Sequence, residues 1–202
     1  MQILDVNGKV LYETQAVNLK ELVETAIAGQ ANLATADLRY AVIGDANLKS
    51  ARLTHADLRA TMLHVSNLQY ASLDGANLEG ACLTSCSMYQ ANLRGANLKG
   101  ARLPSPTVVL LANWGELSDQ LTADLMLWDS LNHPNPSAFD KWAETGVCPY
   151  IAYKEVSRAA NFYEKPSLWG KGKECKPYDL MKRVLAEKCP PWTDEQLAKF
   201  SK

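Results

Sequence analysis

The chain of 202 residues lacks the features that identify several common classes of protein. Its five cysteines include no CxxC pair, and an odd number at irregular spacing argues against a disulfide framework. No apolar run approaches the roughly eighteen residues that a membrane-spanning helix needs, and the N-terminus has no signal-peptide pattern. We therefore expect free thiols in a reducing, cytoplasmic environment and no membrane partner.

Charge of one sign is also missing, because the formal net charge is only −1. A near-neutral chain gives no overall indication of a nucleic-acid or membrane partner. Motifs for a nucleophile with its base, for a phosphate-binding loop and for a dinucleotide site are absent as well. These absences predict that the protein is not an enzyme and has no catalytic residues, no metal and no cofactor.

What the sequence does contain is a five-residue repeat that runs from Ala31 to Ser105 in fifteen consecutive pentads. The first position is Ala in twelve pentads, the second is Asn or Asp in eight, and the third is Leu in thirteen. An α-helix turns by about 500° in five residues, so the leucines would spiral around it. A straight strand would place successive leucines on opposite faces. The pattern instead predicts pentads that each form a short extended face and then turn a corner.

In such an arrangement the first and third positions of every pentad point inward, and the remaining positions form the corner and the outer surface. Small Ala beside Leu suits a narrow interior, and Gly at some fifth positions suits a tight corner. We therefore predict a structural core made of the third-position residues: Leu33, Leu38, Ile43, Leu48, Leu53, Leu58, Leu63, Leu68, Leu73, Leu78, Leu83, Met88, Leu93, Leu98 and Leu103.

Pentads such as ANLAT, ADLRY, ANLKS and ANLRG resemble the pentapeptide-repeat protein family, whose consensus is A(N/D)LXX. The resemblance covers residues 31–105. It implies a mainly β solenoid, a right-handed quadrilateral β-helix of about four coils in which four pentads complete each coil. Family members include mimics of double-stranded DNA that bind type II topoisomerases, and also interaction or targeting modules.

The segment before the repeat, residues 1–30, is expected to cap it. Asn7-Gly8 lies between two β-prone runs, which predicts a hairpin with a type I′ turn. Apolar residues then recur at helical spacing, with Asn18 as the N-cap and Gly29 as the stop. A hairpin and one short amphipathic helix are therefore predicted ahead of the first pentad.

The outward positions of the repeat contain one apolar column. Residues twenty apart would stack on one face, and this places Val42, Met62 and Cys82 in a row with Val65 beside them. Exposed apolar residues that gather in this way mark a contact surface. We predict a contact patch at these four residues, covered by the chain's own C-terminal part, by a second copy of the chain or by another protein.

The charged outward positions are mixed in sign. Glu79 interrupts the row of Arg39, Arg59 and Lys99, and the repeat as a whole is slightly basic. A DNA mimic needs a dense negative surface, because duplex DNA carries one charge for about every 1.7 Å of its axis. The repeat has no such surface, which disfavours DNA mimicry. Direct binding of nucleic acid is also disfavoured, because no aromatic residues interleave with the basic ones.

The region 106–202 has a different composition, and we expect a mostly α-helical part that packs partly against the repeat. Pro104 and Pro106 are expected to end the repeat, since each removes a ladder donor. All five Trp and all three Phe of the chain lie after these prolines. Helices are predicted over 119–131, 137–146 and 178–188, around 156–163 and after Thr193.

Three sets of residues in this region have side chains suited to a chemical site. Soft metal ligands occur at wide spacings: His133, Cys148, Cys175 and Cys189. Their spacings do not match a zinc site. Carboxylates fit the polar faces of the helices and are expected to be solvated: Asp124, Asp129, Asp140 and Glu144. The lysines and aromatic residues of 162–188 are diluted by acidic residues, which disfavours an anionic partner.

These observations favour a non-enzymatic, cytoplasmic scaffold for protein–protein contact, with a protein partner or a second copy of the chain. Two alternatives come from other classes of function. One is a DNA-mimic type of binder that modulates a type II topoisomerase. The other is a ligand-binding or catalytic region within 106–202, which a deep pocket with convergent polar groups would favour.

Overall fold

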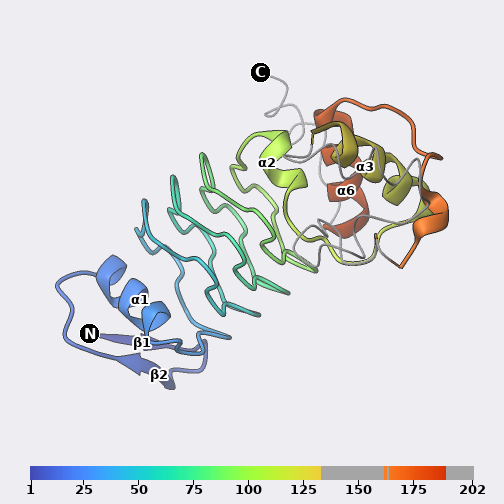
Figure 1. The fold of residues 1–202 in the computed structure, drawn as a ribbon. Coiled ribbons are helices and arrows are strands. Elements are labelled where there is room, and N and C mark those ends of the chain that lie inside the picture. The colour runs from blue at the N-terminus through green and yellow to red at the C-terminus, as the bar shows by residue number, and fades with distance from the viewer. Residues whose placement is uncertain (133–161, 163, 190–202) are drawn as a thin grey trace.

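Figure 1 shows a computed structural model, which describes residues 1–132, 162 and 164–189. The molecule is elongated, with an N-terminal hairpin and helix at one end, the repeat in the middle and a group of helices at the other end (Figure 1). The helices predicted over 137–146, around 156–163 and after Thr193 lie outside the described residues.

The N-terminal hairpin consists of β1 (Gln2–Leu4) and β2 (Val10–Glu13), which pair antiparallel. The prediction of a type I′ turn is wrong, because Gly8 has a positive φ of 85° and Asn7 does not. The loop is held instead by Asp5, whose carboxylate accepts the Asn7 N–H at 2.8 Å and whose carbonyl accepts the Gly8 N–H at 3.0 Å. A type I′ turn requires two residues with positive φ. This loop requires only one, because the Asp5 side chain holds the loop backbone by hydrogen bonds.

The helix α1 (Leu19–Ala28) closes the N-terminal end of the repeat. The Asn18 side chain accepts the Glu21 N–H at 2.8 Å, which satisfies one of the free donors of the first turn. Gly29 is the C-cap, as predicted, although the left-handed residue that follows the helix is Gln30. One face of α1 packs against the first coil through Leu22, Val23 and Ala26.

The repeat is a solenoid in which pentads twenty residues apart stack in register. Parallel bridges join Val42 to Met62, Met62 to Cys82 and Cys82 to Arg102, and bridges elsewhere in the repeat show the same spacing. The Met62 N–H donates to the Ala41 carbonyl at 2.8 Å, which is the ladder bond of this face. Four pentads therefore complete one coil, and neighbouring coils pair like a parallel sheet that is very narrow.

We number the four outer faces by their pentads. The first face holds 36–40, 56–60, 76–80 and 96–100, and the second holds 41–45, 61–65, 81–85 and 101–105. The third face holds 46–50, 66–70 and 86–90, and the fourth holds 31–35, 51–55, 71–75 and 91–95.

The corners lie at the fifth position of the pentads, where the backbone is left-handed. Thr35 is an example, with φ of 63°, and the Ala36 N–H donates across it to the Leu33 carbonyl at 3.1 Å. Most corners are not glycine, although a left-handed non-glycine residue costs about 1–2 kcal/mol. The turn bond and the ladder bonds on both sides offset this cost, so a corner needs no glycine.

The second position of the pentads also has a backbone role that the repeat alone did not reveal. The Asn67 side chain accepts the Gln69 N–H at 3.0 Å, and the Asn92 side chain accepts the Arg94 N–H at 3.1 Å. An Asn or Asp side chain that bonds the backbone two residues later stabilises a turn. This bond gives a physical reason for the Asn and Asp at that position.

The interior of the solenoid contains all fifteen third-position residues, each at most 7% exposed. The three exceptions to Ala at the first position are buried as well, and each donates to a carbonyl of the preceding coil. Thr61 bonds the Leu38 carbonyl at 2.8 Å, and Ser66 bonds the Ile43 carbonyl at 3.2 Å. Cys86 does the same through its thiol. A buried hydroxyl costs little when it is hydrogen-bonded, so these substitutions fit the narrow core.

The ladder continues for one rung beyond Ser105, the last residue of the pentads. The helix α2 (Pro106–Leu110) is inserted, and the chain then returns to the stack. The Asn113 N–H donates to the Ala91 carbonyl at 2.8 Å, and Trp114 is buried at the place of a leucine. Ala-Asn-Trp at 112–114 matches the Ala-Asn-Leu pattern of the repeat. This match is the feature of the sequence that indicates the additional rung.

The C-terminal helices cover this end of the solenoid. They are α3 (Asp119–Asn132), the short 3-10 helix η1 (Pro166–Leu168) and α6 (Pro177–Lys188). Helix α6 packs against both α2 and α3 (Figure 1). Of the helices in the described part of the chain, none is long and apolar enough to cross a membrane.

Candidate interaction surface

The predicted contact patch lies on the second face, near the N-terminal end. Val42 is 67% exposed, Met62 39% and the corner residue Val65 55%. Val42 and Met62 are ladder partners in adjacent coils, so their side chains lie side by side on the outer surface. The stacking that the sequence predicted therefore places three apolar side chains together in solvent.

Cys82 differs from this prediction, because it is only 5% exposed. It lies in the stack between Met62 and Arg102, and its sulfur lies 3.3 Å from the Thr84 hydroxyl. Burial raises the pKa of this thiol, but the hydrogen bond with Thr84 and the charge of Arg102 lower it overall. The small side chain is enclosed by longer neighbours, so Cys82 borders the patch and contributes little surface.

His64 completes the patch by covering bare backbone. Its ring lies against Gly44 in the preceding coil, where a Cβ would come within 2.3 Å of the ring. His64 Nδ1 is buried and has no hydrogen-bond partner among the described residues. The imidazole therefore acts here as a flat side chain that fills the space above Gly44.

The described C-terminal helices do not cover the patch. They stack beyond the last coil of the repeat, while Val42 belongs to the coil next to α1 (Figure 1). The first of the three predicted ways to cover the patch was the chain's own C-terminal part. Its described helices α2, α3 and α6 leave Val42, Met62 and Val65 exposed.

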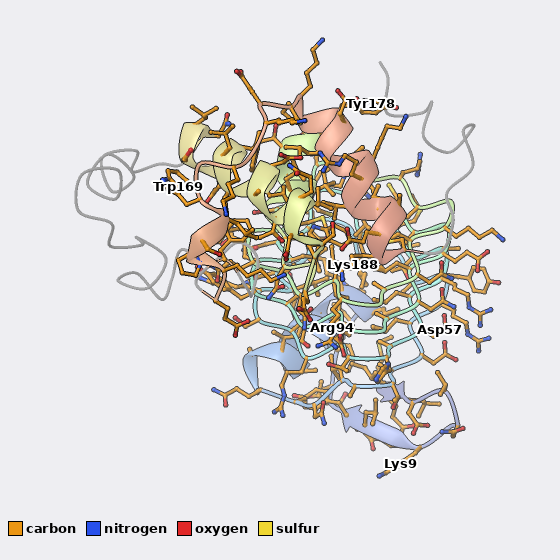
Figure 2. All side chains as sticks on the ribbon, turned by 90° about the vertical axis from the view of Figure 1, so that its right-hand side faces the viewer. Lys9, Asp57, Arg94, Trp169, Tyr178 and Lys188 are labelled. Carbon is orange, nitrogen blue, oxygen red and sulfur yellow. The ribbon has the colours of Figure 1, made fainter. Side chains whose placement is uncertain are left out.

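The first face is charged, and its charges are paired. Arg39 contacts Asp37 at 2.6 Å and Asp57 at 3.8 Å, and Arg59 contacts Asp57 at 2.7 Å. Hydrogen bonds from these guanidinium groups lower the pKa of both carboxyls. Asp57 marks this face in Figure 2. The alternation of sign along the ladder leaves neither a dense negative nor a dense positive surface here.

Two predictions about the C-terminal carboxylates are corrected by the structure. Asp124 is 3% exposed and Asp129 1%, so neither is on a solvated helix face. Asp124 accepts from the Lys173 N–H at 2.7 Å and from Arg183 at 2.6 Å. Burial raises its pKa, but these hydrogen bonds outweigh burial and lower it overall. Asp124 thus joins α3 to α6, because a buried carboxylate requires such partners.

The other chemical sets are only partly described. Cys175 is half-buried and Cys189 is buried. His133, Cys148, Asp140 and Glu144 lie outside the described residues. Within the described ranges, no three His, Cys, Asp or Glu side chains form a group that could hold a metal ion. Lys165 pairs with Asp119 at 2.6 Å, so part of the basic run is neutralised.

Two cavities occur among the described C-terminal residues. One, lined by Trp114, Trp128 and Phe162 among others, has a volume of about 10 Å³, which is the size of one water molecule. The other is an open depression of about 480 Å³ beside Trp128, Leu131 and Cys175. The predicted alternative of a ligand site in 106–202 has this depression as its candidate location.

The structure also contains a groove beside α1 that was not predicted from the sequence. Two adjoining hollows, of about 250 and 540 Å³, share Ile27, Lys49 and Ser50. They lie where the end of α1 meets the corner between the third and fourth faces. No signal in the sequence indicates this groove, because it depends on how α1 replaces a coil below the repeat.

Comparison with known protein families identifies the same five-residue repeat. The family model for pentapeptide repeats matches in eight copies, over residues 26–54, 43–80 and 71–104. No curated protein matches the chain.

Several solved structures are similar over parts of the chain. A pentapeptide repeat protein from the thylakoid lumen of Arabidopsis thaliana is 22% identical over 41% of this chain and 55% of its own, with a TM-score of 0.35. The chain thus spans about half of that protein. One from Nostoc PCC 7120 is 32% identical over 51% of this chain and 85% of its own, with a TM-score of 0.29. HetL, a Nostoc protein involved in heterocyst differentiation regulation, is 34% identical over 34% of this chain and 36% of its own, with a TM-score of 0.16.

The family matches overlap and run without a gap from residue 26 to residue 104, which covers the whole stacked part of the solenoid except its last rung. Through this repeat, the chain belongs to the pentapeptide-repeat protein family.

Proposed function

We propose that the protein is a non-enzymatic scaffold for protein–protein contact, and that its binding surface is the contact patch on the second face. The observation that supports this most is the exposure of Val42, Met62 and Val65 on a regular, hydrogen-bonded wall. Adjacent apolar side chains that stay exposed on a rigid surface mark a place where a partner docks. Membership of a family of repeat scaffolds agrees with this role.

The proposed architecture has three parts: a cap at 1–30, a right-handed quadrilateral β-helix of about four coils at 31–105, and a helical part at 106–202. The β-helix acts as a rigid platform, because each rung is hydrogen-bonded to its neighbours and its interior is packed. The free thiols of Cys82, Cys86 and Cys175 fit a cytoplasmic location.

The partner is proposed to be a protein. The patch is apolar and the neighbouring first face is neutralised by ion pairs, so neither surface matches the charge of nucleic acid. The same pairing argues against a DNA-mimic role, which requires a dense negative surface. A second copy of the chain is the rival occupant of the patch.

The substitution Met62→Glu tests this proposal. It places a charge in the patch without entering the core, because the second position points outward. We expect the melting temperature to change by less than about 4 °C, since a surface change costs about 1 kcal/mol or less. Capture of partner proteins by the immobilised chain should be lost, and Lys99→Glu on the first face serves as the control that should retain it.

Sedimentation of the purified protein separates the two occupants. If a second copy covers the patch, the mass of the unchanged protein is that of a dimer and Met62→Glu lowers it to that of a monomer. If another protein binds there, the mass stays the same and only capture is lost. A large fall in melting temperature, or capture that survives in Met62→Glu, would refute the proposal.

A further inference from the structure

The ladder of the solenoid follows one rule at the second position of each pentad. The N–H of that residue donates to the carbonyl of the first-position residue 21 places earlier. Asp57 donates to Ala36 at 2.9 Å and Ser72 donates to Ala51 at 2.8 Å. At the N-terminal edge of the repeat the coil below is replaced by α1, so the rule fails and the free donors need other acceptors.

One of these donors is satisfied by a carboxylate. The Asn47 N–H would bond residue 26 by the ladder rule, but this residue is inside α1. Glu24 of α1 supplies its side chain instead, and Glu24 Oε1 accepts the Asn47 N–H at 2.7 Å. The chain itself thus shows that a carboxylate fits the exposed ladder edge.

The next donor along this edge is the Arg52 N–H, and it has no such acceptor. The ladder rule would join it to the Ala31 carbonyl, yet no described residue accepts it. Ala31 and Arg52 both line the hollow of about 250 Å³. The ladder therefore opens here into the groove beside α1.

The composition of the groove favours a negative group. Lys49 and Arg52 line it, and within the described ranges neither forms an ion pair with a carboxylate. Lys49 lines both hollows, and its ammonium lies 5.8 Å from the centre of the Tyr70 ring in the next coil. Glu24 contributes the one carboxylate of the lining, and its Oε1 already accepts a hydrogen bond. The floor is apolar, from Ile27 and neighbouring alanines.

We propose that this groove binds an acidic side chain in a peptide segment of a partner protein. The carboxylate accepts from the Arg52 N–H and guanidinium and lies near the Lys49 ammonium. The apolar residue next to it in the peptide rests on Ile27 and Ala31. Charge-assisted hydrogen bonds of this type are the strong ones, and the backbone donor fixes their direction. This site is separate from the contact patch, because it lies at the corner of the third and fourth faces.

Figure 2 helps to place the site. Its view is from the right-hand side of Figure 1 and labels Arg94, which belongs to the same face as Arg52 and lies two coils further along the solenoid. The N-terminal end of the molecule, where α1 and the groove are found, is marked by Lys9 at the bottom of the picture.

The test is an NMR titration of the full chain that follows the backbone amide of Arg52. Two probes differ only in charge, acetyl-Leu-Glu-amide and its neutral counterpart acetyl-Leu-Gln-amide. Sodium acetate is a third probe that lacks the apolar side chain, and sodium chloride at equal ionic strength is the salt control. We expect a saturable shift of the Arg52 amide with the Glu peptide, a weaker response to acetate, and no response to the Gln peptide or to chloride.

Variants then assign the contacts. Lys49→Gln and Arg52→Gln should each weaken binding by up to about fivefold, which is the range of exposed ion pairs. Arg52→Gln keeps the backbone donor, so its amide should still shift at saturation. Lys99→Gln, on the first face, should change nothing. Met62→Glu should also leave this titration unchanged, so failure here and failure of the contact patch are distinguishable.

Three results would overturn the proposal. An equal shift with the neutral peptide would show that the carboxylate is not recognised. An equal affinity for acetate and the Glu peptide would remove the role of the apolar floor and of a peptide. The absence of any saturable shift, with both peptides silent, would show that the open ladder edge is only hydrated.

Discussion

Gly44→Ala is expected to drive the His64 ring out of the contact patch while the solenoid stays folded. The new Cβ would lie 2.3 Å from Cε1 of His64 and 2.7 Å from each ring nitrogen, closer than any real contact. The backbone of Gly44 is not left-handed, so alanine itself is compatible with the position. The obstacle is the end of one side chain, which can rotate toward solvent.

The magnitude of the effect on stability is small, because two contributions oppose each other. Replacing glycine where the backbone allows alanine stabilises a protein by about 0.4–1 kcal/mol through the unfolded chain. Forcing His64 from its preferred rotamer costs about 0.5–1.5 kcal/mol. The net change is within about 1 kcal/mol, which corresponds to a shift in melting temperature of less than about 4 °C for a chain of this size.

The assay combines thermal unfolding with NMR of the imidazole Cε1–H signal of His64. We expect a nearly unchanged melting temperature, a clear change of the His64 signal toward that of a solvated ring, and weaker partner binding by the patch. The double variant Gly44→Ala with His64→Ala should be more stable than the sum of the single changes predicts, because the clash is gone. A fall of more than about 8 °C in Gly44→Ala, or an unchanged His64 signal, would refute the reasoning.

Two further predictions concern the stability of the scaffold. Leu63→Ala should lower the free energy of unfolding by about 2–5 kcal/mol, because Leu63 is fully buried between packed coils, and urea denaturation measures this. A loss below about 1 kcal/mol would show that the interior is loosely packed. Arg183→Gln should cost about 1–3 kcal/mol at neutral pH, less than a fully buried pair, because Arg183 is 38% exposed. The Asp124 pKa is lowered in the folded chain, so this stabilisation is present above the unfolded pKa and is lost as the pH falls through the folded pKa. Unfolding measured from pH 7 down to pH 3 should therefore show the two proteins converging in acid.

Much of the fold could be predicted from the pattern of the pentads. The leucine column had to be internal, because a period of five is incompatible with both a helix stripe and a straight strand. The stacking of Val42 on Met62 followed from the four pentads per coil that the family resemblance implied. The hairpin and α1 were also recognised, from Asn7-Gly8 and from the N-cap Asn18.

Other features could not be predicted, because they depend on which segments meet in space. Asp124 looked solvated on a helix, yet it is buried where Arg183 reaches it from α6. Cys82 looked like part of the exposed strip, yet its neighbours in the stack enclose it. The rung at Asn113 was hidden by the inserted helix α2, which separates it from the regular repeat.

The sequence by itself determined which positions of each pentad are buried, and its resemblance to a known family implied that four pentads form one coil. It also determined the rows that face outward, and so the position of the contact patch. Only the tertiary structure decided which outward residues remain accessible and which donors remain unpaired. The reason is that exposure and pairing depend on the coil above and below. At the N-terminal end that neighbour is α1, which satisfies the Asn47 N–H and leaves the Arg52 N–H open.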